Sequence, residues 1–200
     1  MKRLTELTKG KTCAVVSNSG DLINYEYGEF IDSHDVVIRC NWSIIDEYEK
    51  HIGTRTDIRV INIHLAKLIV DFEKVSRDSH YNKVFPCWSS LKIEKIINDE
   101  LIILHPNANN LLKSVSLNLK NNEVYSSSKF NIDRYDHSTG MTSILLASKL
   151  FESISCFCFD FFQKEQKHYF ENSIHNFKSH NNSEEYKVSR SLSNVKFYPS

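Results

Sequence analysis

The chain has 200 residues, of which 40% are hydrophobic, and its 25 basic and 25 acidic side chains give a formal net charge of zero. This length and composition are typical of a soluble globular protein, and we expect a single domain over residues 1–200. The balanced charge and the lack of a polybasic tail give no electrostatic sign of nucleic-acid binding, so we expect no nucleic-acid partner.

Short apolar runs alternate with helical patterns along the chain. Buried strands are predicted at residues 13–16, 35–39, 58–61, 84–85, 101–104 and 154–159. Helices are predicted at residues 22–31, 66–75, 92–98, 109–119 and 141–151, the last of them with Ser138 or its neighbour as N-cap. Strands that alternate with helices predict one Rossmann-like α/β/α domain with a mostly parallel sheet, which binds ligands at the carboxyl ends of its strands.

Two polar stretches, residues 120–136 and 163–186, show no periodic pattern. The second is rich in histidine and asparagine, and a long irregular segment in a compact domain is commonly functional or disordered. Residues 1–9 are polar and lack the apolar segment of a signal peptide. The apolar runs are all too short to cross a membrane, so we expect no transmembrane segment.

Five cysteines are present, at positions 13, 40, 87, 156 and 158, without the clustering typical of zinc ligands. Cys156 and Cys158 are separated by one residue in an apolar run, which favours two residues on the same face of a strand over a metal site. An odd set of unclustered cysteines favours a reducing, cytoplasmic compartment.

The first predicted strand is followed by small residues, Ser17-Asn18-Ser19-Gly20, and then by Asp21. Small residues let a ligand approach the backbone closely, so the amides of this turn can meet a phosphate or a sugar. Taken alone the segment is read more simply as an ordinary strand-to-helix turn. It matches neither the dinucleotide-binding glycine pattern nor a Walker loop.

A longer pattern surrounds this turn. Residues 13–23 read Cys-Ala-Val-Val-Ser-Asn-Ser-Gly-Asp-Leu-Ile, residues 31–41 read Ile-Asp-Ser-His-Asp-Val-Val-Ile-Arg-Cys-Asn, and residues 52–56 read Ile-Gly-Thr-Arg-Thr. In this order the three segments closely resemble the large sialyl motif of the eukaryotic-type sialyltransferases, glycosyltransferase family 29.

Three later blocks are similar to the remaining motifs of that family. Residues 137–141, His-Ser-Thr-Gly-Met, resemble the start of the small motif; residues 168–171, His-Tyr-Phe-Glu, the short His-Tyr motif; and residues 180–185, His-Asn-Asn-Ser-Glu-Glu, the very small motif. Each block alone has a simpler explanation, a helix cap in the first case and a solvated loop in the others. Their order and spacing favour the family assignment.

The resemblance implies a GT-A-like sialyltransferase variant and a single catalytic domain over residues 1–200. The implied reaction moves sialic acid from CMP-sialic acid to a hydroxyl of a galactose-type acceptor glycan, with inversion at the anomeric carbon. No Asp-x-Asp run follows a strand in this sequence, and we expect neither a metal nor another cofactor.

The same resemblance assigns roles to individual residues. His180 corresponds to the general base, with Glu185 supporting its surroundings, and His168 corresponds to the histidine that contacts the donor phosphate and helps CMP to leave. Histidine has an unperturbed pKa near neutrality, which suits a base. The residues that correspond to donor-binding positions are Asn18, Ser19, Gly20, Asp21, Asn41, Ser138, Thr139, Gly140 and Tyr169.

Several positions depart from the family pattern. Asp21 replaces a common asparagine, and because its carboxylate repels a phosphate we expect it beside a ribose hydroxyl. Cys13 matches a cysteine that is disulfide-bonded in vertebrate members, but Phe151 or Glu152 occupies the partner position, so we expect no bridge. The missing bridge, anchor and stem suggest a minimal microbial enzyme, cytoplasmic or peripheral at the membrane, acting on lipooligosaccharide or another surface glycan.

Two alternatives stay open at this point. The same fold can use another CMP-activated ulosonic acid, such as Kdo, because no motif residue distinguishes the sugar. The chain can also be a CMP-binding homologue without catalysis, although the presence of both His168 and His180 favours an enzyme.

Overall fold

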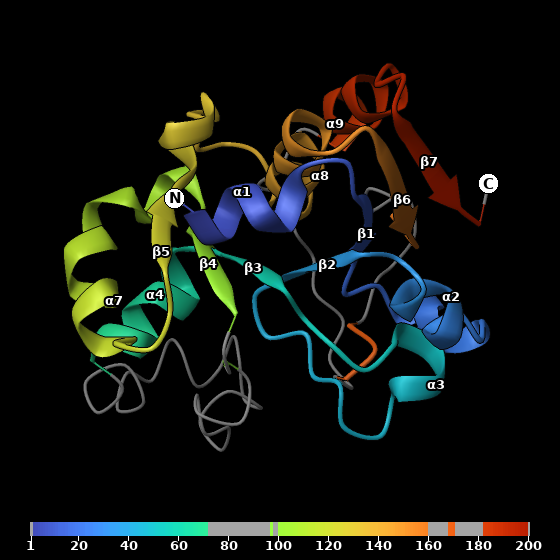
Figure 1. The fold of residues 1–200 in the computed structure, drawn as a ribbon, viewed down its shortest axis with the longest axis horizontal. Helices are drawn as coiled ribbons and strands as arrows, with labels where there is room; N and C mark the ends of the chain where they lie inside the picture. The colour runs from blue at the N-terminus through green and yellow to red at the C-terminus, as the bar shows by residue number, and fades with distance from the viewer. Residues whose placement is uncertain (1, 72–96, 98–99, 160–167, 171–181, 200) are drawn as a thin grey trace.

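Seven strands of the chain form one parallel sheet, in the order β5-β4-β3-β2-β1-β6-β7 (Figure 1). The computed structural model describes residues 2–71, 97, 100–159, 168–170 and 182–199. Every neighbouring pair of strands is parallel, which confirms the predicted α/β class and sheet type. The strands are β1 (Thr12–Val16), β2 (Val36–Cys40), β3 (Ile58–Ile61), β4 (Leu101–Leu104), β5 (Val124–Ser126), β6 (Ser153–Phe157) and β7 (Val195–Tyr198).

The chain enters this sheet near its middle and winds outward in both directions. It runs from β1 through β2, β3 and β4 to β5, and then returns to place β6 on the other side of β1. Parallel sheets that change their winding direction in this way open a crevice at the carboxyl ends of the two strands concerned. The segments that follow β1 and β6 are therefore the first place to look for a ligand site.

Helices cover both faces of the sheet, as predicted (Figure 1). Alternate strand residues divide the core: Cys13 and Val15 pack with residues of α8, whereas Ala14 and Val16 pack with residues of α2. The first face carries α1 (Lys2–Thr8), η5 (Ser127–Phe130), α8 (Thr139–Leu150) and α9 (Asn182–Arg190); the second carries η1 (Gly20–Asn24), α2 (Gly28–Asp32), α3 (Glu49–Ile52), α4 (Ile63–Val70), η4 (Pro106–Leu111) and α7 (Leu112–Asn118).

Helix α8 lies over the centre of the first face and confirms the helix predicted there. Ser138 is its N-cap, and its inward face consists of apolar residues such as Met141, Ile144 and Ala147, all fully buried. They pack in one cluster with residues of β1, β2 and β3. Because α8 precedes a parallel strand, its N-terminus lies at the carboxyl edge of the sheet.

Some predicted elements differ from the structure. The helix predicted at 22–31 is divided into η1 and α2, because Tyr25 between them has extended backbone with φ −127° and ψ 152°. Its carbonyl oxygen lies 2.7 Å from Nδ1 of His51, and its ring stacks on Tyr27. The polar stretch 120–136 contains β5 and η5. Cys158 lies beyond β6 with a φ of 54°, so it is not a residue of that strand.

Helix α9 begins within the stretch 163–186 that was predicted to be irregular, and α1 and β7 had no predicted counterpart. The expected strand at 84–85, most of the helix at 92–98, and the part of the helix 66–75 beyond residue 71 lie outside the described residues.

Candidate functional site

The turn after β1 ties together the carboxyl ends of β1 and β6. Ser17 Oγ donates a 2.8 Å hydrogen bond to the carbonyl of Cys158, just after β6, and accepts one from the N–H of Ser19 at 3.1 Å. Ser19 Oγ accepts in turn from the N–H of Asp21, and Gly20 begins η1. Ser19, Gly20 and Asp21 therefore lie where ligands bind in sheets of this kind.

Asn18 connects this turn to the loop that follows β2. Its Nδ2 donates to the carbonyl oxygen of Cys40 at 3.2 Å, and its Oδ1 accepts a hydrogen bond from the hydroxyl of Ser43. The sequence prediction missed Ser43, because one serine three residues after a strand carries no distinctive pattern. The turn and the loop are thus bound to each other by the residue predicted to contact the donor.

Asn41, the residue that follows β2, is held by both groups of its side-chain amide. Its Oδ1 accepts from the N–H of Asn62 after β3 at 2.9 Å, and its Nδ2 donates to Oγ1 of Thr139 at 3.3 Å. Its backbone has a φ of 46°, in the left-handed region that few non-glycine residues adopt. Asn41 therefore joins the ends of β2 and β3 to the start of α8.

The start of α8 brings the predicted residues Ser138–Gly140 to the same edge. Ser138 Oγ accepts a hydrogen bond from the N–H of Met141 at 3.0 Å, as an N-cap does. A Cβ added to Gly140 would lie 2.9 Å from the ring of Phe159, so the small residue permits this close contact. The first N–H groups of a helix have no partner within the helix, which makes this end suitable for an anion.

Glu185 of α9 lies against the same helix start. Its Oε1 accepts from the N–H of Ser138 and its Oε2 from the Ser138 hydroxyl, each at 2.6 Å, and the residue is only 2% exposed. We expected Glu185 to support the surroundings of His180, which lies outside the described residues. Among the described residues, its carboxylate bonds to Ser138 of the predicted donor cradle.

His168 lies beside the turn after β1. It forms an isolated antiparallel bridge with Ser19, and its ring stacks on Phe170 at a centroid distance of 5.2 Å. The N–H of Tyr169 donates to the carbonyl of Asn18 at 3.2 Å. The predicted leaving-group histidine is thus next to the predicted donor turn.

Tyr169 anchors this segment through its side chain. The ring is 6% exposed, and the hydroxyl donates to the carbonyl of Ile44 at 2.7 Å. Burial raises the pKa of this hydroxyl well above its usual range, so it stays protonated. Tyr169 thereby fixes the segment that carries His168, and its predicted contact with the donor stays a prediction.

An ion cluster lies next to the start of α8. Arg134 contacts Asp136 at 2.8 Å and Glu184 of α9 at 2.6 Å. The hydrogen bonds from Arg134 lower the pKa of Asp136 to about 2 and lower that of Glu184. The pKa of His137, between this cluster and Ser138, is lowered mainly by burial and also by the charge of Arg134. No motif predicted the cluster.

A comparison with known protein families gives a match over nearly the whole chain, and this match includes all four predicted motif blocks. The sequence profile described as "Glycosyltransferase family 29 (sialyltransferase)" matches residues 3–87 and 67–197. The chain belongs to glycosyltransferase family 29. The family resemblance inferred from the motifs is therefore confirmed.

Relatives in family 29 differ in the sugars that their names mention. The chain is 26% identical over 202 residues to the beta-1,6-galactosyltransferase GALT29A of Arabidopsis thaliana, covering 92% of the chain and 51% of the relative. It is 38% identical over 71 residues to the beta-galactoside alpha-2,6-sialyltransferase 1 of Mus musculus, covering 36% of the chain and 17% of the relative. The chain thus spans about half or less of the length of these relatives.

A crystal structure of a mammalian sialyltransferase shares the fold of this family 29 chain. The TM-score is 0.61 at 18% sequence identity, and the match covers 98% of the chain and 76% of that protein. A second structure of a mammalian sialyltransferase, in complex with Gal-beta-1-3GalNAc-ortho-nitrophenol, matches with the same score. These likenesses confirm the single α/β domain fold.

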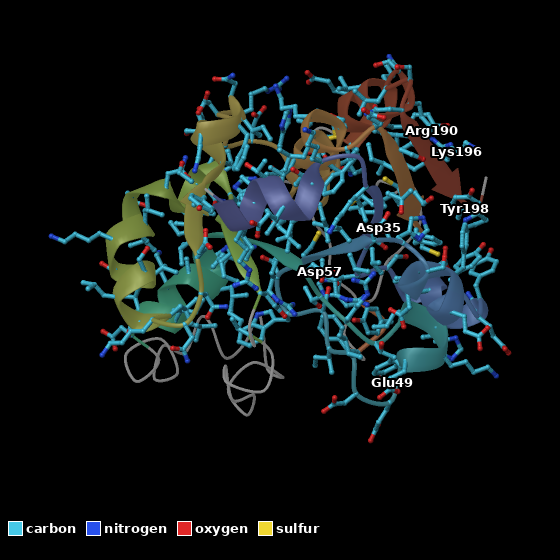
Figure 2. The ribbon with its side chains drawn as sticks, viewed as in Figure 1. Asp35, Glu49, Asp57, Arg190, Lys196 and Tyr198 are labelled. Carbon is cyan, nitrogen blue, oxygen red and sulfur yellow. The ribbon has the colours of Figure 1, made fainter. Side chains whose placement is uncertain are left out.

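Asp35 of the large motif and Asp57, the residue that follows this motif, have structural contacts away from this edge. Asp35 accepts from the N–H and the hydroxyl of Thr12, and Asp57 accepts from the N–H of Val37 and from Arg55. Both aspartates precede their strands, so they lie at the amino ends of β2 and β3 (Figure 2). They brace the sheet on the side opposite the predicted donor site.

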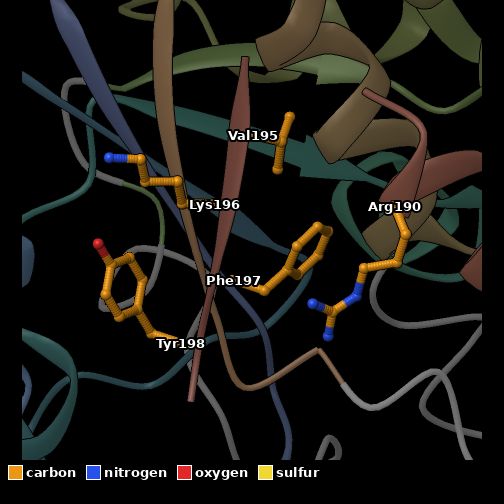
Figure 3. Close-up of a pocket in the computed structure, with 5 residues that line it drawn as sticks. All are labelled: Arg190, Val195, Lys196, Phe197 and Tyr198. Carbon is orange, nitrogen blue, oxygen red and sulfur yellow. The ribbon is translucent and has the colours of Figure 1, made fainter. Parts of the chain in front are cut away.

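None of the residues predicted to bind the donor lines the pocket in Figure 3. It borders the edge strand β7 and is lined by Arg190, Val195, Lys196, Phe197 and Tyr198 (Figure 3). Within the described ranges, no group of three or more His, Cys, Asp or Glu residues is arranged to hold a metal ion. None of the helices in the described part of the chain has the length and apolar character needed to span a bilayer.

Proposed function

We propose that this chain transfers sialic acid from CMP-sialic acid to a hydroxyl of a galactose-terminated glycan, with inversion and without a metal. One observation carries the proposal: the turn after β1, Asn41, the start of α8 and His168 come from distant parts of the sequence and meet at one edge of the sheet. The names of relatives, a beta-galactoside alpha-2,6-sialyltransferase among them, support this donor and acceptor class.

The residues at this edge suit an anionic donor. The start of α8 offers backbone N–H groups and the positive end of a helix dipole, which favour a phosphate. His168, once protonated, can donate a hydrogen bond to the departing CMP phosphate and stabilise its charge. Asn18 and Asn41 supply amide groups to the nucleotide and sugar, and Asp21 supplies an acceptor for a ribose hydroxyl.

The acceptor hydroxyl requires a base, and we assign this role to His180. Support comes from the contact of Glu185 with Ser138, since α9 begins at Asn182, only two residues after His180. The described start of α9 is thereby bound to the start of α8. A neutral histidine next to this point would take the acceptor proton as the glycosidic bond to the donor sugar forms.

A second function has an observation in its favour. The plant galactosyltransferase matches 92% of the chain, so a galactose donor is the main alternative within the family. CMP-Kdo is a third donor, and CMP binding without catalysis is the remaining possibility.

The four described cysteines are all free and buried, which agrees with a reducing compartment.

Purified protein incubated separately with CMP-sialic acid, CMP-Kdo and UDP-galactose, each with a lactose-type acceptor, distinguishes these functions. We expect sialylated product from CMP-sialic acid, with undiminished activity in EDTA. His180→Ala should lower kcat by 10²-fold or more, roughly the contribution of a general base, while CMP binding persists. Product from UDP-galactose alone would replace the sialyltransferase assignment, and CMP binding without any product would leave a binding protein.

A further inference from the structure

We propose that the buried ion pair of Arg59 and Glu100 is a positioning device for donor binding, because it holds Asn41 in the left-handed conformation that joins β2 to the start of α8. This inference rests on the proposed function, in which Asn41 contacts the donor. Neither Arg59 nor Glu100 was predicted as a site residue. In the sequence, Arg59 stands out only as a charged residue within the otherwise apolar run 58–61.

The ion pair has well-defined geometry in the interior of the protein. Arg59 Nε lies 2.6 Å from Glu100 Oε2, and its Nη2 lies 2.8 Å from Oε1, so the two side chains form a bidentate pair. The two side chains are 1% and 4% exposed. Arg59 lies in β3 between Ile58 and Val60, which are completely buried.

Such a pair is poorly explained by stability alone. Removing two charges from water costs free energy that their attraction repays incompletely, and well-packed apolar residues often serve as well or better. A buried ion pair is therefore a reason to ask what its geometry fixes. In this protein the guanidinium has a further contact, because Nη1 donates a 2.6 Å hydrogen bond to the backbone carbonyl of Asn41.

Asn41 gains from such support because its φ of 46° lies in the left-handed region, which costs free energy for residues with a side chain, although less for asparagine than for most. Residues in such conformations persist where the surrounding structure over-determines them, and they are common at functional sites. All four of its polar groups are engaged: the N–H with the carbonyl of Val60, the carbonyl with Arg59, Oδ1 with Asn62 and Nδ2 with Thr139.

The contact with Arg59 is the charged one among these four. Charge-assisted hydrogen bonds are stronger than neutral ones, so its loss is expected to release the backbone of Asn41 most readily. The Nδ2 contact with Thr139 would then be lost as well, and the donor site would lose the fixed relation between β2 and α8. Since this relation serves the bound donor before and during reaction, the change should appear in donor affinity more than in kcat.

The neighbouring strand offers a matched control. Arg39 of β2 lies opposite Arg59 in the sheet register and is completely buried. Its guanidinium donates to the carbonyls of Ile52 and Arg55 and, among the described residues, makes no hydrogen bond to Asn41. Lysine at either position keeps the charge and loses the guanidinium fork. A general effect of removing a buried arginine should therefore appear in both variants.

The test measures the Kd for CMP by calorimetry and the KM for the donor in Arg59→Lys and Arg39→Lys, well below the unfolding temperature of each variant. We expect Arg59→Lys to raise both constants roughly tenfold or more, the loss of a hydrogen bond to a charged group, with kcat within about threefold. Arg39→Lys should leave both constants within about twofold of the wild type. Equal effects of the two substitutions would overturn the inference.

A glycine at position 41 gives a second, independent test, because glycine adopts a positive φ without strain. In a protein that already carries Asn41→Gly, the further substitution Arg59→Lys should raise the Kd for CMP by less than about twofold. If the full effect of Arg59→Lys persisted there, Arg59 would not act through Asn41. Glu100→Gln, which weakens the same pair, takes the place of Arg59→Lys if the latter does not fold, with the same comparison.

Measurements on the wild-type protein distinguish a failure of the proposed catalysis from a failure of the proposed role of Arg59. If it binds CMP but transfers no sugar, the proposed catalysis fails while the Kd comparison still decides the role of Arg59. If it binds no CMP at all, both the proposed function and this inference are wrong.

Discussion

The carboxylate of Glu185 closes the N-terminus of helix α8 by accepting hydrogen bonds from both the N–H and the hydroxyl of Ser138, each at 2.6 Å. The same hydroxyl oxygen accepts from the N–H of Met141. The helix start is therefore already engaged at its first position, and a donor phosphate would have to use the following amides, those of Thr139 and Gly140. The contact also binds the first turn of α9 to the proposed donor site.

Glu185→Gln should weaken both the fold and the transfer reaction. The amide can accept one hydrogen bond where the carboxylate accepts two, and the loss of a charge-assisted bond in a buried site costs about 2 kcal/mol. We expect a lower free energy of unfolding in urea and a lower kcat/KM. Glu184→Gln on the same turn, which removes an exposed ion pair, is the control and should change kcat/KM by less than about twofold. Equal losses from both variants would contradict a specific role for Glu185.

The sequence allowed much of the fold to be predicted, because buried parallel strands are apolar throughout and stand out from their surroundings. Residues 13–16 and 101–104 are examples, and both are strands in the structure. β5 and β7 were missed for the opposite reason: they lie at the two edges of the sheet and are half-exposed, so their sequences mix polar and apolar residues. At the break between η1 and α2, the carbonyl of Tyr25 is bonded to His51, a contact distant in sequence that no local pattern records.

Part of the candidate site was also accessible from the sequence. Motif order brought Ser19, Asn41, Thr139 and His168 together, and the structure places them at one edge. Their supports were not predicted, because Glu100 and Ser43 act through contacts between separate strands and loops that no local pattern records. Ligand contacts of the nine donor-binding positions, and the role of His180, stay predictions.

Gly28→Ala should destabilise the protein although alanine is normally the better helix former. A Cβ at this position would lie 2.2 Å from the carbonyl oxygen of Glu49 and 2.7 Å from that of Lys50, so the backbone of α3 would have to move away from α2. We expect a loss of about 3 kcal/mol in the free energy of unfolding, at the upper end for overpacking. Gly10→Ala, with a φ of 67° and open space around the Cβ, is the control and should cost only about 1–2 kcal/mol. An equal cost at both positions would show that α3 yields easily.

The Arg134 cluster should stabilise the fold in a pH-dependent way. Because the pKa of Asp136 is lowered to about 2 and that of Glu184 is also lowered, the stabilisation is present above the unfolded-state values of about 4 and is lost as pH falls from there toward 2. Arg134→Gln should therefore lower the urea midpoint at pH 7 and have little effect near pH 2. The exposed Lys187→Gln is the control for charge removal on α9. A constant difference across this range, unchanged by 1 M salt, would contradict an electrostatic origin.

The thiols of Cys13, Cys40 and Cys156 should be unreactive in the folded protein. All three are buried and free, and burial raises their pKa values, that of Cys40 to about 11. Since the thiolate is the reactive form, iodoacetamide at pH 8 should leave peptides containing these residues unlabelled until urea unfolds the chain. Mass spectrometry of native and unfolded samples gives the measurement. Rapid labelling of Cys13 in the native sample, or its recovery in a disulfide, would show that the first strand of the sheet is not buried as the structure has it.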